Sequence, residues 1–155
     1  MKLPQVLSDR YKLKDTEALV RAAMAQAWVV YHLAGALAQK KSERGHKVYA
    51  ASILTRVAMD IHHFILRSCP SCFEHHTDFL KKNPINGHIQ DFEAYVFGLH
   101  NAVNERAGRE LCTDLDSVRA HYRKQLARLE EAGSVTVGAL ADALPTTNGR
   151  YCYTC

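Results

Sequence analysis

An uninterrupted stretch of 27 residues, DTEALVRAAMAQAWVVYHLAGALAQKK from Asp15 to Lys41, constrains the fold more than any other feature. It contains no proline, and its apolar and polar residues do not alternate as they do in a strand. Asp15 or Thr16 can cap its start. Its apolar residues lie near one another on a helical wheel: Leu19, Ala23, Trp28 and Leu33. The stretch therefore predicts one long helix.

The rest of the chain predicts further helices and no strand. We expect them at about residues 47–67, 70–82, 88–107 and 114–131, with a short one near 137–143. Pro70 suits a first helical position, whereas Gly108 and Gly133 suit helix ends. No βαβ alternation appears. The predicted fold is all-α, a four-helix bundle with a fifth helix packed on it.

The chain divides into three parts. Residues 1–14 form an N-terminal extension and residues 15–133 form one helical domain. Residues 134–155 are rich in Gly, Thr and Asn around PTTNGRYCYTC, so we expect a flexible C-terminal tail.

Composition limits the classes of function. The chain has 155 residues, 47% hydrophobic and 23% charged, with a net charge of +4 spread over both signs. This charge is too mild to indicate a nucleic-acid partner. No apolar run reaches the roughly 20 residues that span a bilayer, and the N-terminus shows no apolar leader, so we expect no membrane partner and an intracellular location. Five cysteines in such a protein indicate metal or redox chemistry.

Cys69 and Cys72 form a CxxC pair in SCPSCFEHH. If Pro70 begins a helix, the pair spans its first turn, where side chains three apart have Cβ atoms about 5–6 Å apart. A disulfide needs about 3.5–4.5 Å, which a slightly distorted turn provides. A helix N-terminus also favours thiolate. An exchangeable disulfide is therefore predicted, because so short a loop would stabilise the fold little.

A zinc site is the rival interpretation of the cysteines. Cys152 and Cys155 form a second CxxC, and two such pairs can hold zinc. About 80 residues separate the pairs, however, far more than the roughly 12–20 usual in zinc ribbons and fingers. His75 and His76 could join Cys69 and Cys72, although adjacent helical residues point in different directions. We therefore expect no metal, and zinc stays the alternative.

The segment LHNAVNE places His100, Val103 and Asn104 on one helical face. One apolar and two hydrogen-bonding groups suit a stacked aromatic ring with polar edges. A core face with two satisfied polar residues is the competing interpretation. Trp28 and His32, one turn apart, are open to the same two interpretations.

Three motifs in order resemble the Erv/ALR family of FAD-linked sulfhydryl oxidases. WVVYH, from Trp28 to His32, is similar to the Trp-x-x-x-His of the family's first helix. CPSCFEHH is similar to its active-site CxxC, with His75 where many members have a histidine. FEAYVFGLHNAVNERAGR resembles its aromatic and His-Asn-x-Val-Asn pattern. Together the motifs span about residues 25–110.

The resemblance implies that FAD lies inside the bundle. Cys72 would lie against the flavin and Cys69 would receive electrons. The implied FAD contacts come from four of the expected helices and the segment after one of them: Trp28, His32, His75, His100, Asn101, Val103, Asn104, Arg109 and Tyr122. Arg109 stands where members often have lysine. Tyr122 or Arg119 would replace a tryptophan that the family carries in its fifth helix.

The resemblance also implies an electron path. A dithiol client protein or a thioredoxin-like carrier would reduce Cys152–Cys155, and that pair would reduce Cys69–Cys72. FAD would then pass the electrons to O2, giving H2O2. A tail of about 20 residues reaches about 25 Å, far enough for this exchange. A flavin-less helical interaction module is the non-catalytic alternative.

Further expectations concern the oligomeric state, Cys112 and the cellular location. Homodimers are common in the family, so we expect one here. Cys112 has no predicted partner, and we expect a thiol or a link between subunits. Members occur in the mitochondrial intermembrane space, the secretory pathway and large DNA viruses; for this chain we expect the cytoplasm, with a viral origin favoured.

Overall fold

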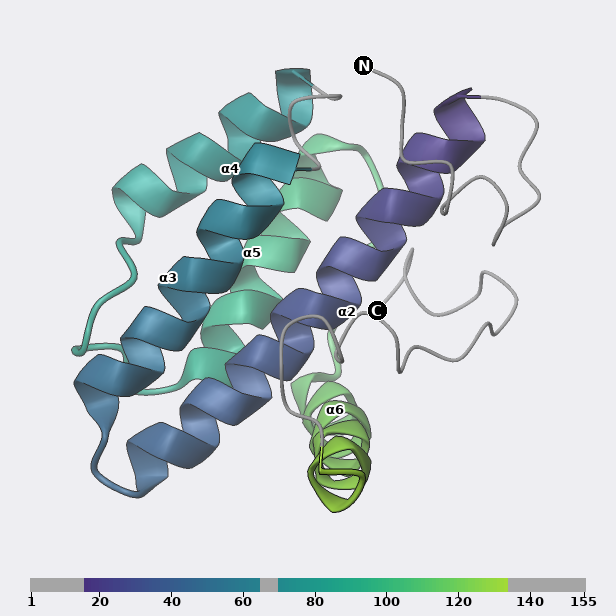
Figure 1. The fold of residues 1–155 in the computed structure, drawn as a ribbon. Helices are drawn as coiled ribbons and strands as arrows, with labels where there is room; N and C mark the ends of the chain where they lie inside the picture. The colour runs from purple at the N-terminus through teal and green to yellow at the C-terminus, as the bar shows by residue number, and fades with distance from the viewer. Residues whose placement is uncertain (1–15, 65–69, 134–155) are drawn as a thin grey trace.

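The computed structural model describes residues 16–64 and 70–133, and within them every regular element is an α-helix. The helices are α2 (Thr16–Glu43), α3 (Lys47–Phe64), α4 (Pro70–Lys82), α5 (Phe92–Arg106) and α6 (Leu115–Glu131), shown in Figure 1. The all-α prediction is confirmed. The N-terminal extension, the tail and the short helix expected near 137–143 lie outside the described residues.

Helix α2 is the centre of the arrangement. It packs against α3, α5 and α6, while α4 packs against α5 (Figure 1). A tight turn joins α2 to α3, and Gly45 occupies it with a φ of 87°. Because side-chain-bearing residues adopt this backbone conformation only with strain, glycine is the residue that suits the turn.

Two hydrophobic clusters line opposite sides of α2. The larger cluster fills the space among α2, α3 and α5, and its fully buried side chains include Tyr31, Leu54, Val57, Phe92, Val96 and Leu99. The smaller cluster joins α2 to α6 through Leu33, Ala36, Tyr122, Leu126 and Leu129. Different residues of α2 therefore contribute to the two clusters.

Helices α2 and α5 approach each other closely at Gly35. A Cβ atom added there would lie 3.0 Å from Val96 Cγ2 and 3.2 Å from the carbonyl oxygen of Phe92. Contacts this short force a neighbour to move, and the Phe92 oxygen belongs to the backbone of α5. Gly35 therefore sets the distance between the two helices that carry most of the candidate site.

The helix boundaries follow local capping. Helix α5 begins at Phe92 rather than near residue 88, because the Asp91 side chain accepts a hydrogen bond of 2.8 Å from the amide of Ala94 and caps the helix there. Helix α6 begins after Asp114, which caps the amide of Ser117 at 2.9 Å. Gly108 and Gly133, with φ of 65° and 71°, follow the ends of α5 and α6 as predicted.

No helix in the described ranges has both the length and the apolar character needed to cross a bilayer.

Candidate functional site

The first turn of α4 carries one cysteine of the CxxC pair. Pro70 is its first residue, as predicted, and Cys72 lies two residues further on. Cys72 is disulfide-bonded. Cys69, Cys152 and Cys155 lie outside the described residues. The helix N-terminus favours a negative charge on the sulfur whenever that bond opens, because amide N–H groups there have no partners within the helix.

Cys72 lines a small cavity between α2, α3, α4 and α5. We call this space the Cys72 cavity. Its walls are formed by Met24, Ala27, Trp28, Tyr31, Ile61, Cys72, His76 and Val103. The surface of the cavity is almost wholly apolar, and its volume holds about one water molecule. A disulfide sulfur thus borders a largely apolar space that aromatic and imidazole rings also line.

Four aromatic rings adjoin one another beside this cavity. Trp28 stacks on His100 with ring centroids 4.0 Å apart and planes 10° apart. His32 bonds to His100 through Nε2 and Nδ1, 3.1 Å apart. Tyr122 of α6 stacks on the other histidine, His32, at 4.7 Å and 9°. The structure therefore brings together four of the residues predicted to contact FAD.

Both histidines of this group are neutral near pH 7. Burial lowers the pKa of His32 to about 3, with His100 and His121 contributing in the same direction. Burial also lowers the pKa of His100 to about 4, assisted by the charge of Arg109. In a neutral pair one nitrogen donates and the other accepts, so the 3.1 Å contact is a hydrogen bond rather than a repulsion between cations.

Buried polar atoms without partners lie on α5 at the same place. His100 Nε2 and both polar atoms of the Asn104 side chain are fully buried and make no hydrogen bond. Asn104 is 1% exposed. Such groups each cost about 1–3 kcal/mol unless a ligand or water satisfies them. His100 and Asn104 are one turn apart, and Val103 between them lines the Cys72 cavity.

These residues fit the chemistry of a planar ring with polar edges. The aromatic faces supply stacking, and the unsatisfied atoms of His100 and Asn104 supply hydrogen bonds. The Cys72 cavity itself is water-sized, and Trp28 and His100 are in van der Waals contact. A ring placed between those two faces therefore requires them to separate.

Asn101 occupies a different position from its neighbours. Its amide donates to the Cys112 carbonyl at 2.8 Å, and its oxygen accepts from the Cys112 amide at 3.0 Å. Both polar atoms of this side chain therefore hold the segment after α5. Cys112 is buried and disulfide-bonded, so the expectation of a free thiol is wrong.

Two other residues predicted to contact FAD, His75 and Arg109, are not part of the wall of the Cys72 cavity. His75 is half-buried and accepts a hydrogen bond of 2.5 Å from Arg106 Nη1, while Arg106 also lies 3.7 Å from Asp78. Arg109 is exposed, and its backbone amide donates to the carbonyl of Asn104 at 2.9 Å. Arg109 is close enough to His100 to lower the pKa of that imidazole.

The FAD contacts predicted from the sequence do not include the two polar residues of the cavity wall, Tyr31 and His76. The Tyr31 hydroxyl is hydrogen-bonded to His76 Nε2. His76 is 3% exposed and lies one turn after Cys72. The i to i+4 spacing from Cys72 was the available signal, because residues four apart share a helical face.

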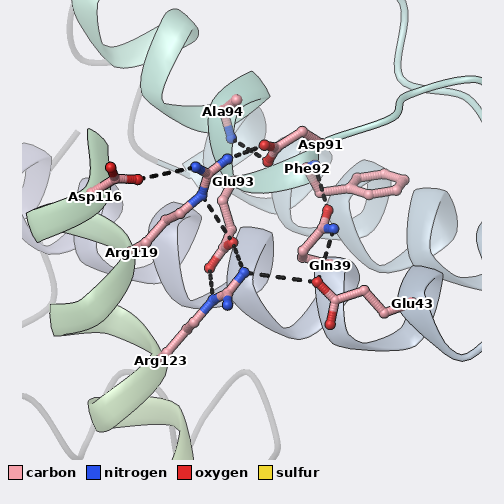
Figure 2. A network of polar contacts seen from close by, with 9 residues as sticks. All are labelled: Gln39, Glu43, Asp91, Phe92, Glu93, Ala94, Asp116, Arg119 and Arg123. Carbon is pink, nitrogen blue, oxygen red and sulfur yellow. Dashed lines mark hydrogen bonds and ion pairs between the residues drawn. The ribbon is translucent and has the colours of Figure 1, made fainter. Parts of the chain in front are cut away.

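A network of charged residues, which we call the Glu93 network, holds α6 against α5 and α2 (Figure 2). Glu93 accepts hydrogen bonds from Arg123 at 2.9 and 2.5 Å and lies 3.4 Å from Arg119 Nε. Arg119 also pairs with Asp91, the cap of α5, and lies 3.4 Å from Asp116. This network fixes the register of α6, which places Tyr122 against His32.

A metal centre has no support within residues 16–64 and 70–133. In those ranges no three His, Cys, Asp or Glu side chains lie close enough together to hold an ion.

In comparisons with protein-family models, curated proteins and solved structures, none matches this chain.

Proposed function

We propose that the protein is a flavin-linked sulfhydryl oxidase, which makes disulfide bonds in dithiol clients with O2 as the final acceptor. One observation carries the proposal: a disulfide-bonded cysteine at a helix N-terminus borders an apolar cavity beside buried polar atoms that lack partners. A purely structural disulfide has no need of such surroundings. The all-α fold agrees with the family that the three motifs resemble.

FAD is the cofactor in this proposal. Trp28, His100, Val103 and Asn104 would hold its rings, while His32 and Tyr122 would support the His100 imidazole from behind. Bound FAD would supply the two-electron acceptor that thiols lack, with hydrogen peroxide as the product of O2. The neutral histidines suit this role because a buried imidazolium would repel Arg109 and lose hydration.

The thiol chemistry belongs to the chain itself. In the proposal the client dithiol reduces the tail cysteines, and a thiolate of Cys152 or Cys155 then attacks the Cys69 sulfur of a Cys69–Cys72 disulfide. That attack forms a mixed disulfide at Cys69 and leaves the bonding electron pair on Cys72 as a thiolate. The other tail thiol then attacks the tail sulfur of this mixed disulfide, so Cys69 leaves as a thiolate and the tail becomes a disulfide. The next client dithiol reduces the tail disulfide and leaves oxidised.

Oxygen consumption with dithiothreitol tests the activity. Wild-type protein loaded with FAD should consume O2 and produce peroxide, and Cys72→Ala should reduce turnover at least a hundredfold because no thiolate forms beside the flavin. Ser52→Ala on the exposed surface of α3 is the control and should keep wild-type turnover. Full turnover in Cys72→Ala would show that the active-site assignment is wrong.

The proposed shuttle role of the C-terminal tail needs a separate test. Cys152→Ser/Cys155→Ser should slow the oxidation of a reduced protein client far more than that of dithiothreitol, since a small thiol reaches Cys69 directly. Equal slowing of both substrates would remove the shuttle role while leaving the oxidase activity in place.

A homodimer is part of the proposal. Val48 and Met59 of α3 are 80% and 53% exposed and lie on one helical face, since eleven residues make about three turns. Exposed apolar side chains on one face favour an interface between subunits. The mass in solution should be twice that of the chain, and Val48→Glu/Met59→Glu should halve it. A wild-type monomer would contradict this part of the proposal.

A further inference from the structure

The Cys72 cavity contains a buried hydrogen-bond donor that the proposed function does not use. His76 lies on the same face of α4 as Cys72, one turn further along, and both side chains line the cavity. His76 Nδ1 is buried and has no hydrogen-bond partner. A buried polar atom without a partner in an apolar space is costly, and a ligand or reacting group can satisfy it.

The proton on His76 can be assigned. Burial lowers the pKa of His76 to about 4, and the neighbouring His62 of α3 acts in the same direction, so the imidazole is neutral near pH 7. Burial raises the pKa of Tyr31 far above its usual value, so this hydroxyl keeps its proton. The Tyr31 hydroxyl can therefore donate to Nε2. A neutral imidazole has one N–H, and when the hydroxyl donates, that N–H is on Nδ1.

We propose that His76 Nδ1–H donates a hydrogen bond to the Cys72 sulfur when its disulfide opens, and that Tyr31 is the positioning residue that fixes this tautomer. The inference rests on the proposed function for its role in turnover. When a thiolate attacks the cysteine paired with Cys72, a new S–S bond forms at that partner. The old bond breaks, and its electron pair stays on Cys72 Sγ, which leaves as thiolate. No proton moves in this step.

A hydrogen bond to the Cys72 thiolate matters because the walls of the cavity are apolar. An apolar wall hydrates a thiolate less well than bulk water does, which raises the pKa of a thiol. The N-terminus of α4 opposes this effect, and a charge-assisted hydrogen bond adds to it. From α2, α3 and α4, the titratable groups around His76 are Tyr31, His62 and Cys72. His76 is thus the neutral imidazole on the cavity wall that Cys72 also lines.

The test measures the acidity of Cys72 in the full-length chain carrying Cys69→Ser. The protein is reduced under nitrogen and alkylated with iodoacetamide in short pulses from about pH 5 to pH 10, where the His76 imidazole stays neutral because its pKa is about 4. Peptide mass spectrometry then follows Cys72 alone. No flavin is needed for this measurement, so its outcome is independent of whether the oxidase activity is found.

Three substitutions at His76 distinguish the effect of a hydrogen-bond donor at the Nδ1 position from the effect of the imidazole ring as a whole. His76→Phe and His76→Gln should lower the acid dissociation constant of Cys72 roughly ten- to hundredfold, because a charge-assisted hydrogen bond is lost. His76→Asn should stay within about threefold of wild type. The Asn amide nitrogen lies where Nδ1 was, whereas the Gln amide lies where Nε2 was.

Tyr31→Phe tests the tautomer, and Tyr95→Phe is its matched control. Tyr31→Phe should lower the constant several-fold because the proton can then move to Nε2. Tyr95 donates its hydroxyl to the Asn83 carbonyl at 2.5 Å, away from the cavity, so its loss should change nothing. Equal constants for wild type and His76→Phe, or a fall in His76→Asn as large as in His76→Phe, would overturn the proposal.

Discussion

The two halves of α5 bury polar side chains in opposite ways. In the N-terminal half, Glu93 is 6% exposed, and both of its oxygens accept hydrogen bonds from Arg123 (Figure 2). In the C-terminal half, Asn104 is 1% exposed, and neither of its polar atoms has a partner. A satisfied buried group contributes to stability, whereas an unsatisfied one costs free energy. The N-terminal half of α5 therefore stabilises the fold, and in our proposal the unsatisfied atoms of the C-terminal half bind the cofactor.

Lowering the pH should destabilise the protein through three buried histidines at the candidate site, and this is the largest expected effect. His32, His76 and His100 have pKa values of about 3, 4 and 4 in the folded protein. Unfolded, each titrates near 6.5, so below that pH the unfolded state binds more protons and the folded state loses stability. Each histidine costs up to about 1.4 kcal/mol per pH unit until the folded pKa is reached.

Urea unfolding followed by helical circular dichroism measures this effect at about pH 7 and about pH 5. The free energy of unfolding should fall by several kcal/mol, and it should fall by about a third less in His76→Asn, which removes one of the three imidazoles. A free energy that does not change between the two pH values would contradict the assignment of neutral buried histidines.

Removing the charge of Glu93, in the N-terminal half of α5, should give the next largest loss in the free energy of unfolding. Glu93→Gln removes the charge that Arg119 and Arg123 share, so we expect a loss of about 2–3 kcal/mol. That is less than a fully buried pair would give, because Arg123 is 52% exposed. Chemical denaturation measures the loss.

The matched control for Glu93→Gln is Glu130→Gln. Glu130 pairs with Lys40 at 2.6 Å where both side chains are about one-third exposed, so the loss should be below about 1 kcal/mol. Equal losses in the two variants would show that the Glu93 network has no special role in holding α6.

Asn104→Leu should have the smallest effect on stability and a large one on cofactor binding. Replacing an unsatisfied buried amide by an apolar group of similar size is expected to change stability by between about zero and a gain of about 1 kcal/mol. FAD affinity should fall at least tenfold. Thermal unfolding and an FAD titration measure the two quantities, and a strongly destabilised Asn104→Leu would show that the amide has a structural partner.

Much of the fold could be predicted from local signals. Helical spacing located the helices, and Pro70, Asp114, Gly108 and Gly133 mark ends that depend only on nearby residues. The start of α5 was predicted four residues early, because the cap formed by Asp91 competes with the preceding turn around Asn86 and His88. Such competition between neighbouring local structures is not visible in periodicity.

The site was harder to predict because its decisive contacts join distant residues. The sequence offers His75 and His76 side by side, and only packing reveals that His76 faces the Cys72 cavity while His75 meets Arg106. Adjacent residues on a helix point about 100° apart, so a small error in helical phase exchanges their roles. The pairing of Glu93 with Arg123 and of Asn101 with Cys112 likewise needed the three-dimensional fold.

The visible absorption spectrum of the purified protein tests the central claim most directly. The account predicts one bound flavin per chain, before or after adding FAD, with the fluorescence of Trp28, the single tryptophan, quenched by the flavin because Trp28 forms part of the proposed site. A colourless protein that takes up no added FAD and keeps its Trp28 fluorescence would contradict the account.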